Sequence, residues 1–322
     1  MTTVSFFATV QDDIQLVEKR IRSQADDKNH PDLSAALEHL LASGGKRMRP
    51  TVVFLVGNLL GAPQDKLVTL GAAVEMLHTA TLVHDDLIDG SLLRRGTSTL
   101  NARWSPAATV LTGDFLFAKA AKLAAEADHL PLMKLFAETL AVIVNGELTQ
   151  LFAARGSVVR ENYYERIYAK TASLFEMSAR AAAMVSPADE QTIEALRLFG
   201  YEIGMAFQIV DDVLDFTGNQ AAVGKPVGSD LLQGLVTLPA LYYVENNPED
   251  DDVRLLKDGG WGNRERMERL IVSIRASEAI RQSVDEARER VGRALAAIKR
   301  LPDSTEKSAL KKLALYIVDR NL

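Results

Sequence analysis

Two matched aspartate-rich segments carry the strongest chemical signal in the sequence. They read Leu82-Val-His-Asp-Asp-Leu-Ile-Asp89 and Gln208-Ile-Val-Asp-Asp-Val-Leu-Asp215. On a helix, residues four apart lie about 40° from each other around the axis, so the outer aspartates of each segment project from one face. The apolar residues beside them predict helices that are at least half buried, where carboxylates need a cationic partner. Each segment therefore predicts a cation site.

Magnesium is the cation that best fits these ligands. The sequence has no cysteine and only 5 histidines, and oxygen-only ligands are typical of Mg²⁺, which commonly binds one or two carboxylates together with substrate phosphates. Ion pairs with Arg94 or Arg95 would explain one motif, but two matched copies favour a metal. The predicted ligands, expected to form two halves of one site, are Asp85, Asp86, Asp89, Asp211, Asp212 and Asp215.

Basic segments indicate what such a metal would bind. Gly44-Gly-Lys-Arg-Met-Arg-Pro50 places cations beside a glycine pair at an expected loop-to-helix junction, where backbone amides and helix polarity favour an anion. An exposed basic turn remains the alternative for this segment taken alone. Further cations are Arg94, Arg95, Lys170 and Lys225. Two groups of cations, with no nucleophile or general-base histidine, suggest two metal-bridged diphosphates.

The composition excludes several other classes of protein. The 322 residues carry 37 Lys and Arg against 43 Asp and Glu, a net charge of −6, which is a poor match for general nucleic-acid binding. The absence of cysteine excludes disulfides, thiolate nucleophiles and iron–sulfur clusters. The first residues lack the features of a signal peptide, and no long uninterrupted apolar run occurs. We therefore expect a soluble, cytoplasmic protein.

The apolar periodicity is helical almost throughout. The segments that favour helix by composition are 115–128, 132–153, 172–185 and 266–300. Thr51-Val-Val-Phe-Leu-Val56 resembles a strand, but it follows Pro50, which favours the start of a helix, and we interpret it as a buried helix. The sequence thus predicts one all-α domain over residues 1–322, with roughly ten or more helices of about 12 residues each.

A di-iron site is a competing interpretation of the acidic residues. Glu75-x-x-His78 and Glu126-x-x-His129 have the spacing of di-iron helical bundles. His129, however, directly precedes Leu130-Pro131 at an expected helix end, and this interpretation leaves both aspartate motifs unexplained. We therefore expect magnesium and not iron.

Taken together, the motifs resemble those of the trans-isoprenyl diphosphate synthase (polyprenyl synthetase) family, of the long-chain type. The likeness covers nearly the whole chain, with the motifs in the same order. The parts that carry it are segment 44–50, the first aspartate motif with Arg94-Arg95, Gly113-Asp-Phe-Leu116, Gly146-Glu-Leu-Thr-Gln150, Lys170-Thr171, segment 204–215, and Gly224-Lys-Pro-Val-Gly-Ser-Asp-Leu231. The resemblance implies the isoprenoid synthase fold, a bundle of helices around a deep central cavity, as a homodimer.

The same resemblance implies a reaction, the Mg²⁺-dependent head-to-tail condensation of isopentenyl diphosphate with an allylic diphosphate such as farnesyl or geranylgeranyl diphosphate. About three Mg²⁺ ions would be bound directly by Asp85, Asp89 and Asp211, with the other motif aspartates assisting. The residues implied for the allylic diphosphate are Arg94, Lys170 and Lys225, those for isopentenyl diphosphate are Lys46, Arg49, His78 and Arg95, and those at the reacting centre are Lys170, Thr171 and Gln208. A core histidine with hydrogen-bonded nitrogens remains the alternative for His78.

One position departs from the family pattern. The family commonly has lysine after the glycine in the segment that here reads Gln233-Gly-Leu-Val-Thr-Leu-Pro239, whereas this chain has Leu235. Any phosphate contact from that position is therefore absent. The other signature residues are intact, which argues against an inactive relative.

Small residues before the first motif bear on the length of the product. Family members with short products place bulky aromatics four or five residues before the first aspartate, where this chain has Thr81 and Ala80. Leu77 further down is not aromatic either, and Phe136 is the candidate floor of the cavity, unless it is ordinary core. The missing bulk would open a channel roughly 6–8 Å below the metals, enough to predict an all-trans product of about C30–C50.

Three alternatives remain open at this point. They are a geranylgeranyl diphosphate synthase with a C20 product, a terpene cyclase, which normally lacks the second motif, and a non-catalytic partner subunit, which would be expected to have lost motif residues. The expected partners are the two diphosphate substrates and a second copy of the chain. No nucleic acid is expected, and at most peripheral membrane contact for product release.

Overall fold

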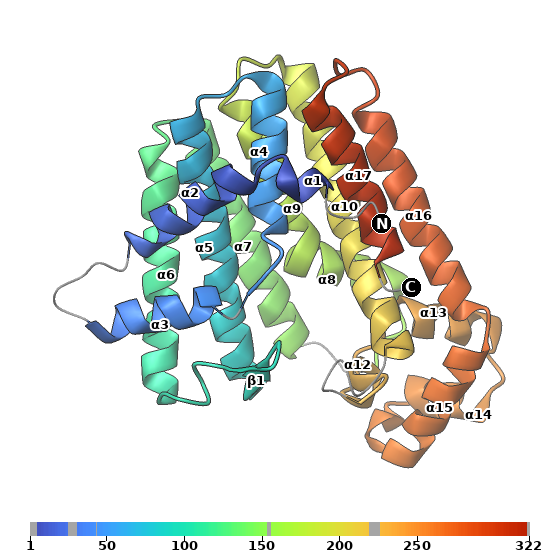
Figure 1. Ribbon diagram of the computed structural model, residues 1–322. Coiled ribbons are helices and arrows are strands. Elements are labelled where there is room, and N and C mark those ends of the chain that lie inside the picture. The colour runs from blue at the N-terminus through green and yellow to red at the C-terminus, as the bar shows by residue number, and fades with distance from the viewer. Residues whose placement is uncertain (1–4, 25–30, 43, 153–155, 219–225, 321–322) are drawn as a thin grey trace. The chain divides into compact units, whose positions relative to one another are not determined.

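The computed structural model describes residues 5–24, 31–42, 44–152, 156–218 and 226–320, and their regular structure is almost entirely helical, as predicted (Figure 1). The chain divides into two compact units. The first consists of residues 1–139, 174–197 and 300–312, and the second of residues 140–173, 198–299 and 313–322. The single domain over 1–322 stays a prediction, and each unit is described by itself.

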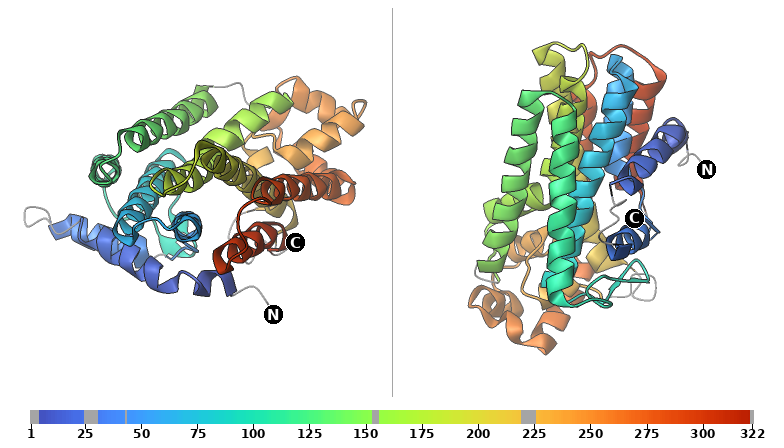
Figure 2. Two further views of the ribbon diagram at one scale, coloured as in Figure 1. Left: turned by 90° about the horizontal axis from the view of Figure 1, so that it is seen from above. Right: turned by 90° about the vertical axis from the view of Figure 1, so that its left-hand side faces the viewer.

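The first unit is built around α5. Its elements are α1 (Ser5–Ala8), α2 (Gln11–Arg22), α3 (Pro31–Ala42), α4 (Met48–Leu60), α5 (Gln64–Ile88), β1 (Leu93–Arg94), β2 (Thr97–Ser98) and α6 (Pro106–Glu126), with parts of α7 (Leu130–Phe152), α9 (Ser173–Met184), α10 (Glu190–Thr217) and α17 (Thr305–Asp319). Helices α4 and α6 run alongside α5, and α2 also contacts it (Figures 1 and 2).

Local sequence explains how two of these helices are placed. The strand-like run 51–56 lies inside α4, a helix in which residues 50–57 are all buried, so the interpretation as a buried helix is confirmed. The helix begins at Met48, two residues before Pro50. Gly113 allows α6 to approach α5 closely, because a methyl group at this position would overlap the ring of His84.

The second unit contains the remaining helices. They are α8 (Arg160–Ile167), a π-helical turn (Tyr168–Ala172), α12 (Ser229–Leu232), α13 (Leu238–Asn246), α14 (Asp251–Lys257), a 3₁₀ turn (Gly260–Gly262), α15 (Arg264–Ala276) and α16 (Ala279–Ala297), with the other parts of α7, α9, α10 and α17. The range 266–300, which favours helix by composition, is helical over most of its length. It forms two helices, because the extended backbone of Ser277 separates α15 from α16.

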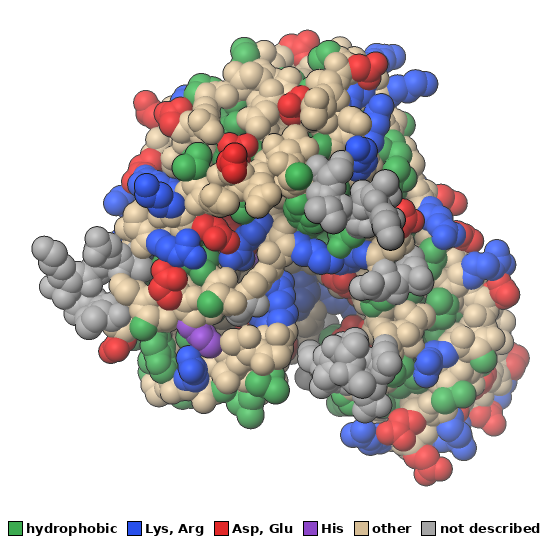
Figure 3. Space-filling view, in the orientation of Figure 1, with side chains coloured by type: hydrophobic (Ala, Val, Ile, Leu, Met, Phe, Trp, Pro, Cys, Tyr) green, Lys and Arg blue, Asp and Glu red, His purple; other side chains and the backbone are tan. Residues whose placement is uncertain are grey.

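The surface over α14 and α15 carries charges of both signs. In Figure 3, basic and acidic side chains are mixed there. Arg264 and Glu268 form one exposed ion pair on α15. Exposed pairs of this kind contribute little to stability.

Within the part of the chain that the structure describes, one helix is long and apolar enough to cross a membrane by length and composition alone. It is α5, and 61% of the relevant window is buried inside the structure. A buried core helix passes the same test, so α5 is weak evidence for a membrane span.

Candidate functional site

The first aspartate motif stands at the carboxyl end of α5. The helix ends at Ile88 and Asp89 is its C-cap residue. Asp85 is partly exposed and Asp89 is exposed. The carbonyl groups at a helix C-terminus carry partial negative charge. The carboxylates and the helix end therefore both attract a cation at this place.

Asp86 has a different role from its neighbour Asp85. It is buried, and its Oδ1 accepts hydrogen bonds from Nε of Arg94 at 2.9 Å and from Nη2 of Arg94 at 2.8 Å. Arg94 belongs to the short hairpin of β1 and β2, which the sequence analysis did not predict. The ion pair weighed as an alternative to metal binding therefore exists for this one aspartate.

Four arginines act on His78. Burial lowers the pKa of His78 well below its usual value, and the charges of Arg49, Arg95, Arg94 and Arg47 lower that pKa further. By surface area His78 is only part-buried, but protein atoms crowd its ring closely enough to disfavour the imidazolium. Arg49 and Arg95, expected to bind isopentenyl diphosphate, and Arg94, expected to bind the allylic diphosphate, thus all act on the same imidazole. That imidazole is neutral and can still form hydrogen bonds.

The glutamates of the di-iron interpretation are occupied by arginines. Oε1 of Glu75 accepts a hydrogen bond from Nη1 of Arg47 at 2.9 Å, and both side chains are largely buried. Glu126 is paired with Arg20. Among the described residues, no group of three or more histidines, aspartates and glutamates could hold a metal ion by itself. Both glutamates of that interpretation thus already have an arginine partner.

The basic segment 44–50 forms the turn into α4. Gly44 and Lys46 are exposed, and the guanidinium of Arg95 donates a hydrogen bond to the carbonyl oxygen of Gly44. The guanidinium of Arg49 lies over the ring of Phe175, 4.7 Å from its centroid. The four residues predicted for isopentenyl diphosphate therefore all lie within the first unit.

The face of α5 that leads down from the motif differs in part from the prediction. His78, Thr81 and Asp85 are partly exposed and lie on one side of the helix. Ala80 and Leu77 are 0% exposed. An opening beside Ala80 is thus not what the structure shows, and Thr81 is the small residue with accessible surface.

Phe136 lies in the first part of α7, within the first unit, and is buried. Its burial is compatible both with a cavity floor and with ordinary core.

Asp211 opens the second motif, near the end of α10. Its side chain is 39% exposed, and its Oδ1 accepts a hydrogen bond from Nη2 of Arg320 at 2.7 Å. The same nitrogen donates to the carbonyl oxygen of Phe207, and the guanidinium lies over the Phe207 ring. No signal in the sequence points to Arg320, because no local spacing links it to Asp211, 109 positions away.

Asp212 is the buried member of the second motif. Tyr163 donates its hydroxyl to Oδ2 of Asp212 at 2.8 Å, and Nε2 of Gln208 donates to Oδ1 at 2.8 Å. Thr171 in turn donates its hydroxyl to Oε1 of Gln208 at 2.6 Å. Burial, with a contribution from nearby Asp230, raises the pKa of Asp212 to about 7, although the hydrogen bonds from Gln208 and Tyr163 oppose that shift. The predicted pair Thr171 and Gln208 is therefore tied to the motif.

Asp215 anchors the motif to α12. Its Oδ1 accepts hydrogen bonds from the backbone nitrogen and the hydroxyl of Ser229, at 3.2 and 2.8 Å, and its Oδ2 accepts one from the backbone nitrogen of Asp230 at 3.3 Å. Lys225, which was predicted for the allylic diphosphate, lies outside the described residues.

Lys170 and Thr171 both belong to the π-helical turn Tyr168–Ala172, a type of irregularity that is frequent at functional sites. Nζ of Lys170 lies 3.4 Å from Oε1 of Glu147 on α7. Gly146, next to this glutamate, permits the close approach, because a methyl group there would overlap the side chain of Ala169.

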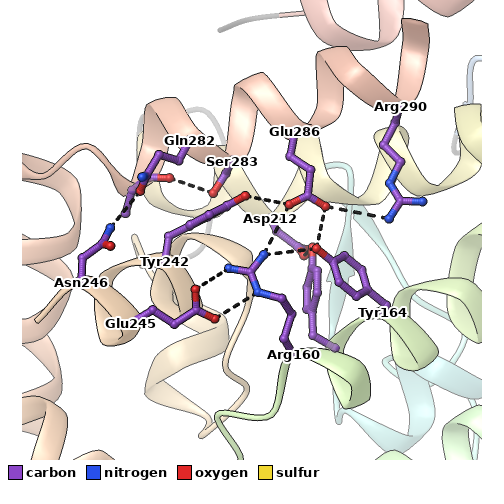
Figure 4. A network of polar contacts seen from close by, with 12 residues as sticks. Arg160, Tyr164, Asp212, Tyr242, Glu245, Asn246, Gln282, Ser283, Glu286 and Arg290 are labelled. Atoms are coloured by element: carbon purple, nitrogen blue, oxygen red, sulfur yellow. Dashed lines mark hydrogen bonds and ion pairs between the residues drawn. The ribbon is translucent and has the colours of Figure 1, made fainter. Parts of the chain in front are cut away.

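A network of polar contacts holds α8, the helix that leads into this turn (Figure 4). Arg160 makes two hydrogen bonds to Glu245 of α13, at 3.0 and 2.7 Å. Tyr164 donates its hydroxyl to Oε1 of Glu286 on α16 at 2.7 Å, and Tyr242 of α13 donates to the other oxygen of that carboxylate. The network thus holds α8 against α13 and α16, and Tyr163 of the same helix donates to Asp212 of α10.

The two motifs share one arrangement. In each, the first aspartate has accessible surface, and the second is buried and bound by a side chain from another element. Accessible carboxylate oxygens that do not form a closed cluster suit Mg²⁺, which shares its coordination sphere with water and substrate phosphates. The residues present therefore fit a magnesium ion that binds together with a phosphate-bearing substrate.

Comparisons with known proteins agree with the resemblance. A family model described as polyprenyl synthetase matches residues 30–271. Octaprenyl diphosphate synthase of Haemophilus influenzae is 37% identical over 312 residues, which cover 96% of this chain and 94% of that protein. Heptaprenyl diphosphate synthase component 2 of Bacillus subtilis is 35% identical over 315 residues, which cover 98% of this chain and 90% of that protein.

A solved structure is similar along the whole chain. It is the polyprenyl synthase of Caulobacter crescentus complexed with calcium and isoprenyl diphosphate. The TM-score is 0.89 at 35% sequence identity, and the match covers 100% of this chain and 98% of that one.

Proposed function

The chain belongs to the polyprenyl synthetase family and is a prenyltransferase, and we propose that it extends an allylic diphosphate with isopentenyl diphosphate, head to tail, to a long-chain all-trans polyprenyl diphosphate. The observation that carries this proposal is the arrangement common to both aspartate motifs, an accessible first aspartate beside a buried, tethered second one. A chain with two such carboxylate sites and clustered arginines is suited to a metal-bound diphosphate.

In this proposal Asp85, Asp89 and Asp211 bind Mg²⁺ directly. Bound Mg²⁺ would stabilise the negative charge that develops on the departing diphosphate. The other motif aspartates are proposed to hold neighbouring groups in place. Asp86 holds Arg94, and Asp212 and Asp215 fix the end of α10 through hydrogen bonds.

The cations divide between the two substrates. Isopentenyl diphosphate is proposed to bind Lys46, Arg49 and Arg95, with His78 as a neutral hydrogen-bonding group. The allylic diphosphate is proposed to bind Arg94, Lys170 and Lys225. Arg94 and Lys170 each have a carboxylate neighbour, Asp86 and Glu147. A diphosphate must therefore share or displace these ion pairs, which favours a substrate that brings its own Mg²⁺.

The chemical step follows from charge. The bond between the allylic carbon and the diphosphate oxygen breaks with its electron pair on oxygen, and the double-bond electrons of isopentenyl diphosphate form the new carbon–carbon bond. A proton then leaves to restore the alkene, and the released diphosphate is the proposed acceptor. Thr171, which is buried, keeps oxygen lone pairs that can stabilise the allylic cation where water is excluded.

The product is proposed to be about C30–C50, with a channel that passes the accessible face of α5 at Thr81. A C20 product is the alternative, since the accessible surface at Thr81 does not by itself fix where the tail ends. The relatives named octaprenyl and heptaprenyl synthases favour the longer product.

We further propose that the chain acts in the cytoplasm as a homodimer. Within the second unit, Val144, Leu148, Leu151 and Phe152 of α7 are exposed apolar residues, and contiguous apolar surface is typical of interfaces. The relative called component 2 makes a dissimilar partner subunit the alternative.

The proposal is tested by incubating the purified chain with Mg²⁺, labelled isopentenyl diphosphate and farnesyl diphosphate, and then sizing the products. We expect a ladder that ends at about C30–C50, none of it formed in EDTA. A product that stops at C20 would agree with prenyltransferase activity but refute the proposal of a long-chain product. If activity appears only after a second, dissimilar protein is added, the active form is a heteromer and the proposed homodimer is wrong.

A further inference from the structure

The turn that carries Leu235 lies beside the second aspartate motif and has no positive charge at that position. Leu235 is partly exposed and follows α12, and its backbone nitrogen donates a hydrogen bond to the carbonyl oxygen of Asp230. This turn therefore lies next to the residues that bind Asp215. Asp230 is itself acidic, and its backbone nitrogen donates a hydrogen bond to Oδ2 of Asp215.

Arg166, in the last turn of α8, reaches this same turn from another element. Its Nη2 donates a hydrogen bond to the carbonyl oxygen of Val236 at 2.6 Å. Its guanidinium also lies 5.5 Å from the centroid of the Tyr163 ring. The cationic group is thus placed beside the residue that follows Leu235.

Arg166 is connected to the motif through one intervening side chain. Its guanidinium lies over the ring of Tyr163. Tyr163 is the residue that donates its hydroxyl to Asp212. The positive charge of Arg166 is therefore close to the second motif.

The bonding of Arg166 differs from that of Arg160 on the same helix. Arg160 is paired with Glu245 and Glu286. Among the described residues, Arg166 forms no ion pair and donates only to a neutral carbonyl oxygen. A guanidinium has five N–H donors. A partly buried arginine with one such acceptor is suited to bind an anion that arrives with the substrate.

We propose that Arg166 is a diphosphate-binding residue for the allylic substrate, which supplies a positive charge at the turn where this chain has the uncharged Leu235. This inference rests on the proposed function. Arg166 also precedes Lys170 by one helical turn in the same run of helical backbone, so both cations come from one structural support.

The test uses Arg166→Gln in the full chain. Glutamine keeps an N–H donor but removes the positive charge, and its side chain is shorter than that of arginine. We expect binding of inorganic diphosphate with MgCl₂, measured by calorimetry, to weaken about 10- to 100-fold. The KM for farnesyl diphosphate should rise similarly, and the KM for isopentenyl diphosphate should change less than about threefold.

Two further variants separate charge from structure. Leu235→Lys in the Arg166→Gln background should restore most of the lost affinity, because it returns a cation to the same turn. Arg288→Gln, which removes an exposed arginine elsewhere in the second unit, should leave binding unchanged. The melting temperature of each variant is measured in parallel.

The proposal is overturned if Arg166→Gln binds diphosphate as tightly as the original chain, or if Leu235→Lys fails to restore binding in a folded double variant. Failure of the proposed function gives a different result. In that case the unmodified chain forms no prenyl product from any allylic diphosphate, while the dependence of diphosphate binding on Arg166 can still be measured.

Discussion

Adjacent aspartates in each motif have different surroundings and therefore different roles. Asp85 has accessible surface, whereas Asp86 is buried against Arg94. Asp211 is accessible in part, whereas Asp212 is buried between Tyr163 and Gln208. A metal that also binds substrate needs the accessible oxygen. The tethered neighbour stabilises the helix end that carries it.

The different surroundings of Asp85 and Asp86 predict different effects when each is substituted: one on turnover and the other on stability. Asp85→Asn should lower turnover by several orders of magnitude with little change in thermal stability, because it removes a proposed Mg²⁺ ligand. Asp86→Asn should instead lower the free energy of unfolding by about 1–3 kcal/mol, because Arg94 loses its charged partner. Steady-state assays and urea titrations measure both. Near-normal turnover in folded Asp85→Asn would refute the metal assignment.

His78 predicts a pH dependence of stability. Its pKa is lowered in the folded state, so below about pH 6.5 the unfolded chain binds a proton that the folded chain does not. Stability should therefore fall with decreasing pH, by at most about 1.4 kcal/mol per pH unit for this one proton. His78→Gln should lose less stability between pH 7.5 and 5.5. Equal losses in both proteins, measured by urea unfolding, would contradict the prediction.

At the residue scale, the sequence reveals ligand types but not all of their partners. The aspartates, Lys170, Thr171 and Gln208 were recognised from their order along the chain, and the bond between Thr171 and Gln208 links two of them. The contact between Arg320 and Asp211 depends on tertiary packing, which cannot be inferred from the spacing of residues along the chain. No motif in the sequence marks Arg166. The one indirect indication is the uncharged Leu235, which lies in the turn that Arg166 contacts.

At the scale of elements, the two sides of α5 give a paired prediction for product length. Thr81→Phe adds a ring on the partly exposed face and should shorten the product toward about C15–C20, with the first condensation preserved, since a residue four positions before Asp85 is about 6 Å below it. Ala80→Phe places the ring in a fully buried position. It should mainly destabilise the protein, by about 1–3 kcal/mol.

Product sizing and thermal melting of both variants separate these effects. A stable, active Thr81→Phe enzyme that makes products of the original length would show that the tail follows another path. A stable Ala80→Phe enzyme with short products would restore the expectation from sequence alone.

Helices were predicted correctly where the local amino-acid composition determines the secondary structure. The run 51–56 was identified as helix because it follows Pro50, which favours the start of a helix, and the run lies inside α4. The break at Ser277 was missed, since serine and glutamate are weak helix breakers and only the extended backbone shows it. The hairpin Leu93–Ser98 was missed because its strands have two residues each, and the π-helical turn has no sequence signature.

At the scale of the whole molecule, self-association predicts the effect of a surface charge. Leu148→Lys places a charge among the exposed apolar residues of α7 and should convert the proposed dimer to monomers. Val272→Lys on α15 is the matched control, because Val272 is also exposed but belongs to another surface. Light scattering after size exclusion gives the masses. Dimers that persist in folded Leu148→Lys would place the interface elsewhere.

The π-helical turn Tyr168–Ala172 has a consequence for protein engineering. A π turn holds one residue more than an α turn, so the helix that follows it is out of phase with the helix before it by about 100°. Lys170 and Thr171 therefore cannot be grafted onto an ideal α-helical scaffold by copying the sequence alone. A designer who removes one residue to regularise the backbone would rotate every later side chain of α9 away from its neighbours.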